Sequence, residues 1–230
     1  MTAGYKQFCP VAMASEILCT KWTIVLLREL VEGSTKFGDL RKGMPRMSPA
    51  LPSQRLKELE ASGVIDRIKS STKRGAYEYV LTEAGRDLRS VIEAIGVWGQ
   101  RWVDADLTLE NLDPTLLMWD MRRNLNVDPL PERQSVIKFH YTDLSEAQQN
   151  WWMIAEETGS IDLCSIDPGF EVDLYVTTTL RPMTSIWMGF TTVRQELEQG
   201  TLSLDGSRTI AEKMQNWLGL SPFAAEKKRL

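Results

Sequence analysis

MSPALPSQRLKELEASGVIDR, at residues 47–67, is the stretch that decides the fold of the first half of this chain. It predicts a helix that opens at Ser48, a turn marked by Gly63 and a strand over 64–68. The helix carries several polar and cationic side chains beside a few leucines. Such a helix is expected to pack along one face and to present the other to a partner.

A hairpin completes this pattern. The basic loop KSSTKRG follows at 69–75, and a second strand is predicted over 76–81. Helix, strand, basic loop and strand in this order are typical of a winged helix, in which one helix enters the major groove of DNA and the hairpin tip reaches the backbone. The sequence therefore predicts a winged helix here.

Two helical segments precede that helix. ASEILCTKWTIVLLREL, at 14–30, has a wide apolar face and is expected to form a short helix and a longer one, and a third, short helix is expected within 35–45. Pro52 is unfavourable at its predicted position in the helix. With Ser48 as N-cap it falls at the fourth helical position, where its missing N–H costs a hydrogen bond, so we expect a distorted or shortened first turn.

The composition is that of an ordinary globular protein, with 43% hydrophobic and 25% charged residues in a chain of 230. It shows no signal peptide and no apolar run of about 18 residues, so a cytoplasmic protein with no membrane partner is expected. The net charge of −4 hides an asymmetry: residues 1–103 hold 16 Lys and Arg against 11 Asp and Glu, and the remainder holds 11 against 20. This split suggests a half that faces nucleic acid, joined to a half with another role.

Catalytic and metal chemistry have little support in the sequence. Cys9, Cys19 and Cys164 are too scattered for a disulfide framework, and no CxxC pair indicates zinc. His140 is the single histidine, so no set of nucleophile, histidine and acid can be assembled. We expect no enzyme activity, no metal and no cofactor, and we expect Cys19 and Cys164 to be packed.

A long helix with an apolar stripe is predicted from about residue 82. A small winged domain cannot cover the whole stripe, so we expect it to pack against the same helix of a second subunit in a symmetric homodimer. The alternative is that the second half of the same chain covers it. The stripe consists of Leu88, Val91, Ile92, Ile95, Trp98 and Trp102.

The second half predicts an α+β domain with a mainly antiparallel sheet. An acidic connector at 104–112 leads to a helix that begins at Asp113 and Pro114. Two short helical pieces are expected between the fourth strand and residue 198, and the segment EETG marks a hairpin between two earlier strands. The strands are expected at 134–141, 150–155, 160–166, 171–179 and 200–204, and a last amphipathic helix at 207–220.

Residues 9–103 resemble the HxlR-type winged helix-turn-helix transcriptional regulators. The resemblance rests on Cys-Pro at 9–10, KW at 21–22, FxxL at 37–40, QRLKELE at 54–60, EYxLT at 78–82 and the late tryptophans. It implies a dimeric DNA-binding regulator that reads an inverted-repeat operator through the helix at 48–60 and the wing at 69–75. The domains expected are a DNA-binding and dimerisation domain at 1–103, a linker at 104–112 and a second domain at 113–222.

Residues 110–222 more loosely resemble the sterol-carrier-protein-like fold, through the order of strand, helix, the strand EQGTLSLDG and a closing helix. Such folds often enclose a hydrophobic tunnel, so the resemblance implies an apolar small-molecule effector. In the alternatives, these apolar side chains are simply the core, or the chain is a lipid or small-molecule carrier whose winged module serves dimerisation or protein contacts. The candidate pocket residues are Phe139, Trp152, Met153, Trp187, Met188 and Phe190.

The candidate DNA-contacting residues lie before the second short helix, along the helix at 48–60 and in the wing. Short polar side chains can read base edges and cations can bind phosphates, and Gln54 has the groups that match an adenine edge. Arg55 can contact guanine or phosphate, or it can pair internally with Glu58 or Glu60. The full set is Lys36, Arg46, Ser48, Pro49, Ser53, Gln54, Arg55, Lys57, Lys73 and Arg74.

Cys9 is a separate candidate. Some members of the resembled family sense oxidants or electrophiles through a cysteine near this Cys-Pro position, which implies a redox sensor here. A reactive thiol requires a stabilised thiolate, and Lys6 and Lys21 can supply positive charge. An unreactive, half-buried thiol is the alternative.

Overall fold

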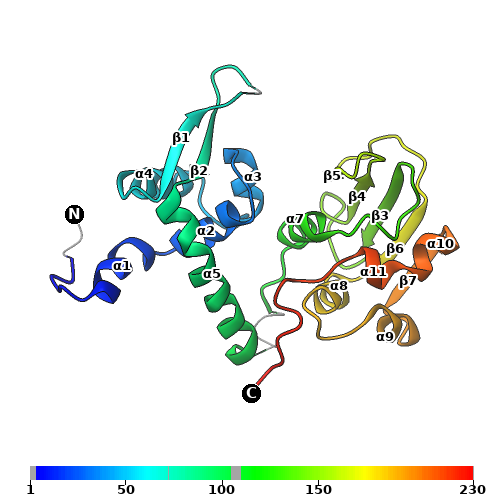
Figure 1. The fold of residues 1–230 in the computed structure, drawn as a ribbon. Helices are drawn as coiled ribbons and strands as arrows, with labels where there is room; N and C mark the ends of the chain where they lie inside the picture. Colours follow the sequence, from blue (N-terminus) through cyan, green and yellow to red (C-terminus); the bar gives the residue numbers. More distant parts are fainter. Residues whose placement is uncertain (1–3, 72, 105–109, 230) are drawn as a thin grey trace. The chain divides into compact units, whose positions relative to one another are not determined.

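The computed structural model describes residues 4–71, 73–104 and 110–229. Residues 105–109 of the predicted linker lie outside the described part of the chain. The chain divides into two units, Met1–Gly96 and Val97–Leu230, and each is described by itself (Figure 1).

The first unit has the order of elements that the sequence predicted for a winged helix. Its hairpin is antiparallel, with Ile65 opposite Leu81 and Lys69 opposite Tyr77. Just before α3, the carbonyl of Thr35 accepts a hydrogen bond from Tyr79 N (2.8 Å) and adds a short third edge to the hairpin. The elements are α1 (Pro10–Leu18), α2 (Thr23–Val31), α3 (Phe37–Lys42), α4 (Leu51–Ala61), β1 (Ile65–Lys69), β2 (Tyr77–Leu81) and α5 (Glu83–Trp102), which continues past the division.

Helix α4 begins later than the sequence predicted. It starts at Leu51 with Ala50 as its N-cap, and Ser48 lies in a preceding turn whose carbonyl accepts from Leu51 N (3.1 Å). The predicted start at Ser48 was therefore wrong, and of the two effects expected of Pro52 the helix shows the shortening, since it begins only at Leu51. Pro52 stands in the first helical turn, where a backbone N–H has no partner within the helix, and its ring is buried.

One junction joins α4, the hairpin and α5. The chain leaves α4 through Gly63, whose φ of 70° is the left-handed conformation that the turn requires. The Thr82 hydroxyl donates to Gly63 O (2.7 Å), and Thr82 N donates to Val64 O (3.1 Å). Gly85 N donates in turn to the Thr82 hydroxyl (3.1 Å), which caps α5. A Cβ on Gly85 would lie 2.1 Å from Val64 O, so only glycine permits this close approach.

The core of the first unit takes only part of the predicted apolar stripe on α5. Ile92 is buried, and Leu88 packs partly buried against the same core. The remaining four stripe residues stay exposed, with fractions of 41% for Val91, 42% for Ile95, 62% for Trp98 and 43% for Trp102. These four recur at helical spacing on one side of α5.

Helix α1 contributes no buried residue to the first unit. Phe8 is 97% exposed, and Val11 and Met13 are also exposed. Cys19 is the C-cap of α1 and is exposed, so the expectation that it is packed was wrong. The reason is local: the helix ends at Leu18, and the apolar face of the sequence resumes only in α2.

The second unit is built on a five-stranded sheet with the order β5-β4-β3-β6-β7. The pair β3–β6 is parallel and the other three pairs are antiparallel, which confirms the predicted α+β class with a mainly antiparallel sheet. Asp113 caps the helix that precedes the sheet, accepting from Thr115 N (3.0 Å) and Leu116 N (3.1 Å). The elements are α7 (Pro114–Asn124), β3 (Ser135–Tyr141), β4 (Asn150–Ala155), β5 (Ile161–Cys164), β6 (Leu174–Thr178), α8 (Leu180–Trp187), α9 (Val193–Glu198), β7 (Leu202–Gly206), α10 (Arg208–Glu212) and α11 (Met214–Trp217).

The last helix differs from its prediction because it is broken in two at Lys213. The indole N–H of the fully buried Trp217 donates to Ile210 O (2.7 Å), so a side chain occupies a carbonyl that a continuous helix would use. No single helix among the described residues is long and apolar enough to cross a membrane, although α1 and α2, bent by 85° between them, meet that length and composition as a pair.

The close approach of Gly85 to the Val64 carbonyl oxygen leads to a prediction about stability. We expect Gly85→Ala to lower the free energy of unfolding by about 2 kcal/mol, because the added Cβ must displace Val64 O. The matched control is Gly99→Ala in the same helix, where a Cβ meets no atom within 4 Å, and we expect it to be neutral or to stabilise by up to about 1 kcal/mol. Urea unfolding of both variants measures this, and equal effects would contradict the close approach.

Candidate nucleic-acid interface

Helix α4 presents a polar face to solvent. Ser53, Gln54 and Lys57 are exposed, and the buried side of the helix is formed by Leu56, Leu59 and Pro52. Figure 1 shows α4 at the base of the hairpin, so the helix and the wing belong to one continuous surface of the first unit. A helix with short polar and cationic side chains on its free face can read base edges and contact phosphates.

Arg55 does not share that face. Its guanidinium donates to Lys21 O (3.2 Å) and pairs with the Glu58 carboxylate, and its side chain is only 12% exposed. Gln54 donates to the other Glu58 oxygen (3.0 Å). Burial alone would raise the pKa of the Glu58 carboxyl, but the hydrogen bonds from Arg55 and Gln54 outweigh it and lower that pKa. Of the two alternatives for Arg55, the internal pair with Glu58 is the one found.

This network lines a groove of about 680 Å³ between α1 and α4. Glu16 and Ile17 form the α1 side, and Arg55 and Glu58 form the α4 side. One flank of α4 therefore faces α1, and of the candidates on the exposed face of this helix Gln54 lines the groove, whereas Ser53 and Lys57 do not.

The turn before α4 carries three further candidates. Arg46, Ser48 and Pro49 are all exposed there. Ser48 is not the N-cap, so its hydroxyl stands one turn before the helix start and is not bonded to the first helical N–H groups. These residues extend the exposed polar surface of α4 toward its N-terminal end.

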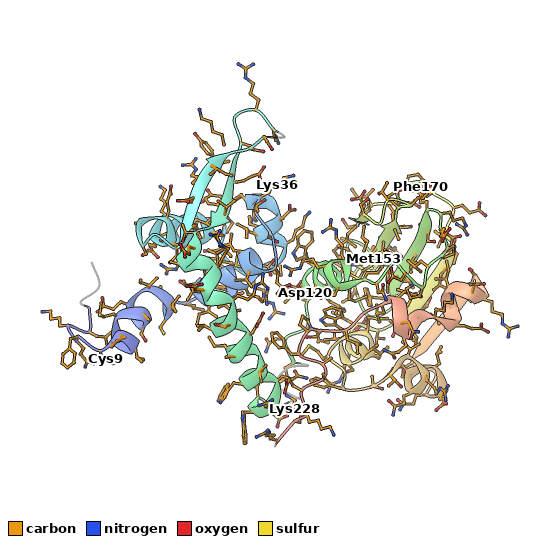
Figure 2. All side chains as sticks on the ribbon, in the orientation of Figure 1. Cys9, Lys36, Asp120, Met153, Phe170 and Lys228 are labelled. Carbon is orange, nitrogen blue, oxygen red and sulfur yellow. The ribbon has the colours of Figure 1, made fainter. Side chains whose placement is uncertain are left out.

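The wing carries its cations at the tip. Lys73 and Arg74 are exposed, and the loop is closed by hydrogen bonds from Ser70 N to Ala76 O (2.9 Å) and from Ala76 N to Lys73 O (3.1 Å). Lys36, labelled in Figure 2, is exposed at the start of α3. The sequence analysis missed Arg67, whose guanidinium lies 3.7 Å from the centre of the Tyr77 ring. Its position follows from the hairpin register, in which Tyr77 lies opposite Lys69 and diagonal to Arg67, and the sequence does not specify that register.

The predicted ligand-pocket residues of the second unit do not converge. Phe139, Met153 and Trp187 are buried in its main core, with Met188 partly buried against them. Trp152 lies on the opposite face of the sheet with Val136 and Ile154, because successive residues of β4 point to opposite faces. Phe190 lies under the Lys228 ammonium, 5.3 Å from its ring centre. An apolar effector and the sterol-carrier likeness stay predictions.

Cys9 precedes α1 and is exposed. Its side chain makes no formal capping hydrogen bond, yet the backbone N–H groups of Ala12 and Val11 favour the thiolate and lower the pKa of the thiol. Cys164 is half-buried and packs against the small cluster on the outer face of the second sheet, as expected. Within the described ranges, no group of three or more His, Cys, Asp and Glu side chains could hold a metal ion.

Comparison with known proteins places the first unit in a family. Residues 17–107 match the family model described as HxlR-like helix-turn-helix. YvaP of Bacillus subtilis, an uncharacterized HTH-type transcriptional regulator, is 32% identical over 99 residues, which cover 43% of this chain and 92% of that protein. YdeP of the same organism, described in the same words, is 36% identical over 96 residues, which cover 42% of this chain and 75% of that protein.

A solved structure also matches part of the chain. The reduced form of the transcriptional regulator YodB from B. subtilis is 25% identical, and the match covers 41% of this chain and 93% of that one with a TM-score of 0.36. On the family model and the two sequence relatives, this chain belongs to the HxlR-like helix-turn-helix family.

Proposed function

We propose that this chain is a DNA-binding transcriptional regulator that acts as a homodimer. The observation that carries the proposal is the winged-helix surface of the first unit, on which the outer face of α4 and the wing tip are both exposed and polar or cationic. Family membership supports it, since the matched relatives are named HTH-type transcriptional regulators. In this proposal α4 enters the major groove and the wing contacts the adjacent backbone.

The distribution of charge along the chain supports binding to DNA through the first unit. The first 103 residues carry an excess of Lys and Arg, and the remainder carries an excess of Asp and Glu. A basic half is attracted to phosphates, whereas an acidic half is repelled by them. We propose Ser53 and Lys57 as the residues of α4 that face the major groove of DNA, with Gln54 beside them on the flank toward α1 and with Lys73 and Arg74 at the DNA backbone. The end of the DNA-binding domain at residue 103 and the start of the second domain at residue 113 are also part of the proposal.

The exposed apolar residues support a dimer. Val91, Ile95, Trp98 and Trp102 form a stripe on α5, and exposed apolar stripes of this kind are typical of association surfaces. Phe8, which precedes α1, and Val11 and Met13 within α1 enlarge the exposed apolar surface of the chain. A two-fold dimer would present two α4 helices, so we propose an inverted-repeat operator. In the alternative, the chain is a lipid or small-molecule carrier whose winged module serves dimerisation or protein contacts and does not bind DNA.

The wing tip tests the DNA-binding proposal. We expect binding to a duplex from the region upstream of the chain's own reading frame to weaken as salt rises, because phosphate contacts release counterions. The double variant Lys73→Ala, Arg74→Ala is expected to reduce the slope of log K against log salt by up to about 1.8, since each phosphate contact contributes about 0.9. The control is Arg208→Ala with Lys227→Ala, which removes two exposed cations from the second unit.

Fluorescence anisotropy at several salt concentrations measures both slopes. Binding that does not respond to salt, or a wing variant that matches the control, would contradict the proposal. A protein that dimerises but does not bind the duplex would favour the carrier.

The stripe on α5 tests the dimer. We expect Trp98→Glu to convert the dimer to a monomer, because a carboxylate in an apolar interface must be desolvated without a partner. Ile166→Glu places the same charge on an apolar side chain of the second unit that is 80% exposed, and it should leave the dimer intact. Sedimentation velocity distinguishes the species, and a wild-type monomer at tens of micromolar would refute the dimer.

We also propose that Cys9 is a reactive thiol of this regulator. The observation that favours it is the lowered pKa of the thiol at the exposed start of α1, since the thiolate is the form that attacks electrophiles. The half-buried alternative is not supported, because Cys9 is exposed.

The pH dependence of alkylation tests this second proposal. In a variant with Cys19→Ser and Cys164→Ser, the rate of reaction with iodoacetamide follows the thiolate fraction of Cys9. Because the pKa is lowered in the folded chain, we expect the midpoint of the rate profile at a lower pH than for the same chain in urea. Coincident midpoints would show that the fold does not activate this thiol.

A further inference from the structure

A hollow of about 390 Å³ lies between the inner side of the wing and the start of α3, and we call it the wing hollow. Its cationic walls are Lys36 before α3, Arg67 on β1 and Lys73 in the wing loop. Tyr77 and Ser70 contribute an aromatic ring and a hydroxyl. The hollow therefore gathers three cations from three separate elements of the first unit.

These cations are available to a ligand. Lys36, Arg67 and Lys73 are exposed, and no ion pair joins any of them to a carboxylate among the described residues. The nearby Glu78 carboxylate accepts hydrogen bonds from the Ser70 hydroxyl (2.6 Å) and the Thr35 hydroxyl (3.4 Å), and its single negative charge offsets only one of the three cations. The hollow thus keeps an excess of positive charge, in contrast to Arg55, whose charge is balanced by Glu58.

Arg67 is held in place by a neighbouring ring. Its guanidinium stacks 3.7 Å from the centre of the Tyr77 ring, a contact that leaves the N–H groups at the edge of the guanidinium free to bond outward. Stacking restricts the side chain before any ligand arrives, so less conformational entropy is lost when the ligand binds. Lys36 and Lys73 have no such support and act as point charges at the rim.

We propose that the wing hollow binds a phosphate of the DNA backbone, with Arg67 as the bidentate ligand and Tyr77 as the residue that positions it. The proposal rests on the proposed DNA-binding function and adds an anchor on the inner side of the wing, which shares only Lys73 with the tip. A planar guanidinium matches two phosphate oxygens, and the two lysines add charge on either side. With a volume of about 390 Å³, the hollow has room for a phosphate group.

The contact would carry no sequence information. A backbone phosphate is present at every step of a duplex, so the wing hollow would strengthen binding to operator and unrelated DNA alike. It would set the depth at which the wing sits, whereas the outer face of α4 would select the sequence.

Substitutions at Arg67 and Tyr77 test the inference in the full chain. We expect Arg67→Gln to reduce the slope of log K against log salt by about 0.9, with a similar loss of affinity on the upstream duplex and on an unrelated duplex. Tyr77→Leu should lose part of the same affinity, whereas Tyr77→Phe keeps the ring and should bind like the wild type. Arg208→Gln is the charge-matched control on the second unit, with a side chain 89% exposed.

The outcomes separate this inference from the proposed function. If wild-type binding depends on salt but the Arg67→Gln variant has the same salt slope as Arg208→Gln, the phosphate site in the wing hollow is overturned. The proposed DNA-binding function is then retained. Wild-type protein that binds no duplex overturns both. Equal losses for Tyr77→Phe and Tyr77→Leu overturn the positioning role of the ring. Thermal unfolding of each variant verifies that these exposed substitutions leave the fold intact.

Discussion

The geometry of the first unit depends on one carbonyl group, that of Val64. It accepts a hydrogen bond from Thr82 N, and Gly85 passes it so closely that no side chain could stand there. The same junction holds the end of α4, the start of β1, the end of β2 and the first turn of α5. Because these elements share one anchor, the helix proposed to enter the groove, the wing and the helix proposed to pair subunits are fixed together.

Which cations can meet DNA is decided by their partners and not by their number. Arg55 lies on the helix that the sequence singles out, yet Glu58 and Lys21 O hold its guanidinium within the unit. Arg67 lies on a strand, stacks on Tyr77 and meets no carboxylate among the described residues. An ion pair lowers the attraction of a cation for phosphate, whereas stacking on a ring orients the cation and leaves its charge in place.

The winged helix was predictable because each of its elements has a local signal: the leucine spacing of α4, the turn at Gly63 and the basic loop between two strands. The start of α4 was not predictable, because Ser48 is a residue type that often caps helices. The chain instead forms a turn at Ser48, and the helix begins at Leu51 with Pro52 in its first turn. The stripe on α5 was found, but periodicity cannot divide it between Ile92 in the core and Trp98 in solvent. Arg67 and the two faces of the second sheet, which separate Trp152 from Phe139, depend on strand register that the sequence does not specify.

The central claim is that two copies of this winged helix bind one DNA duplex with two-fold symmetry. Hydroxyl-radical footprinting on the DNA upstream of the chain's own reading frame tests it most directly. The account predicts two clusters of protected backbone positions related by a two-fold axis, with centres about one helical turn, or a multiple of about 34 Å, apart. A single unsymmetric cluster, or no protection at concentrations where the protein is dimeric, would contradict it.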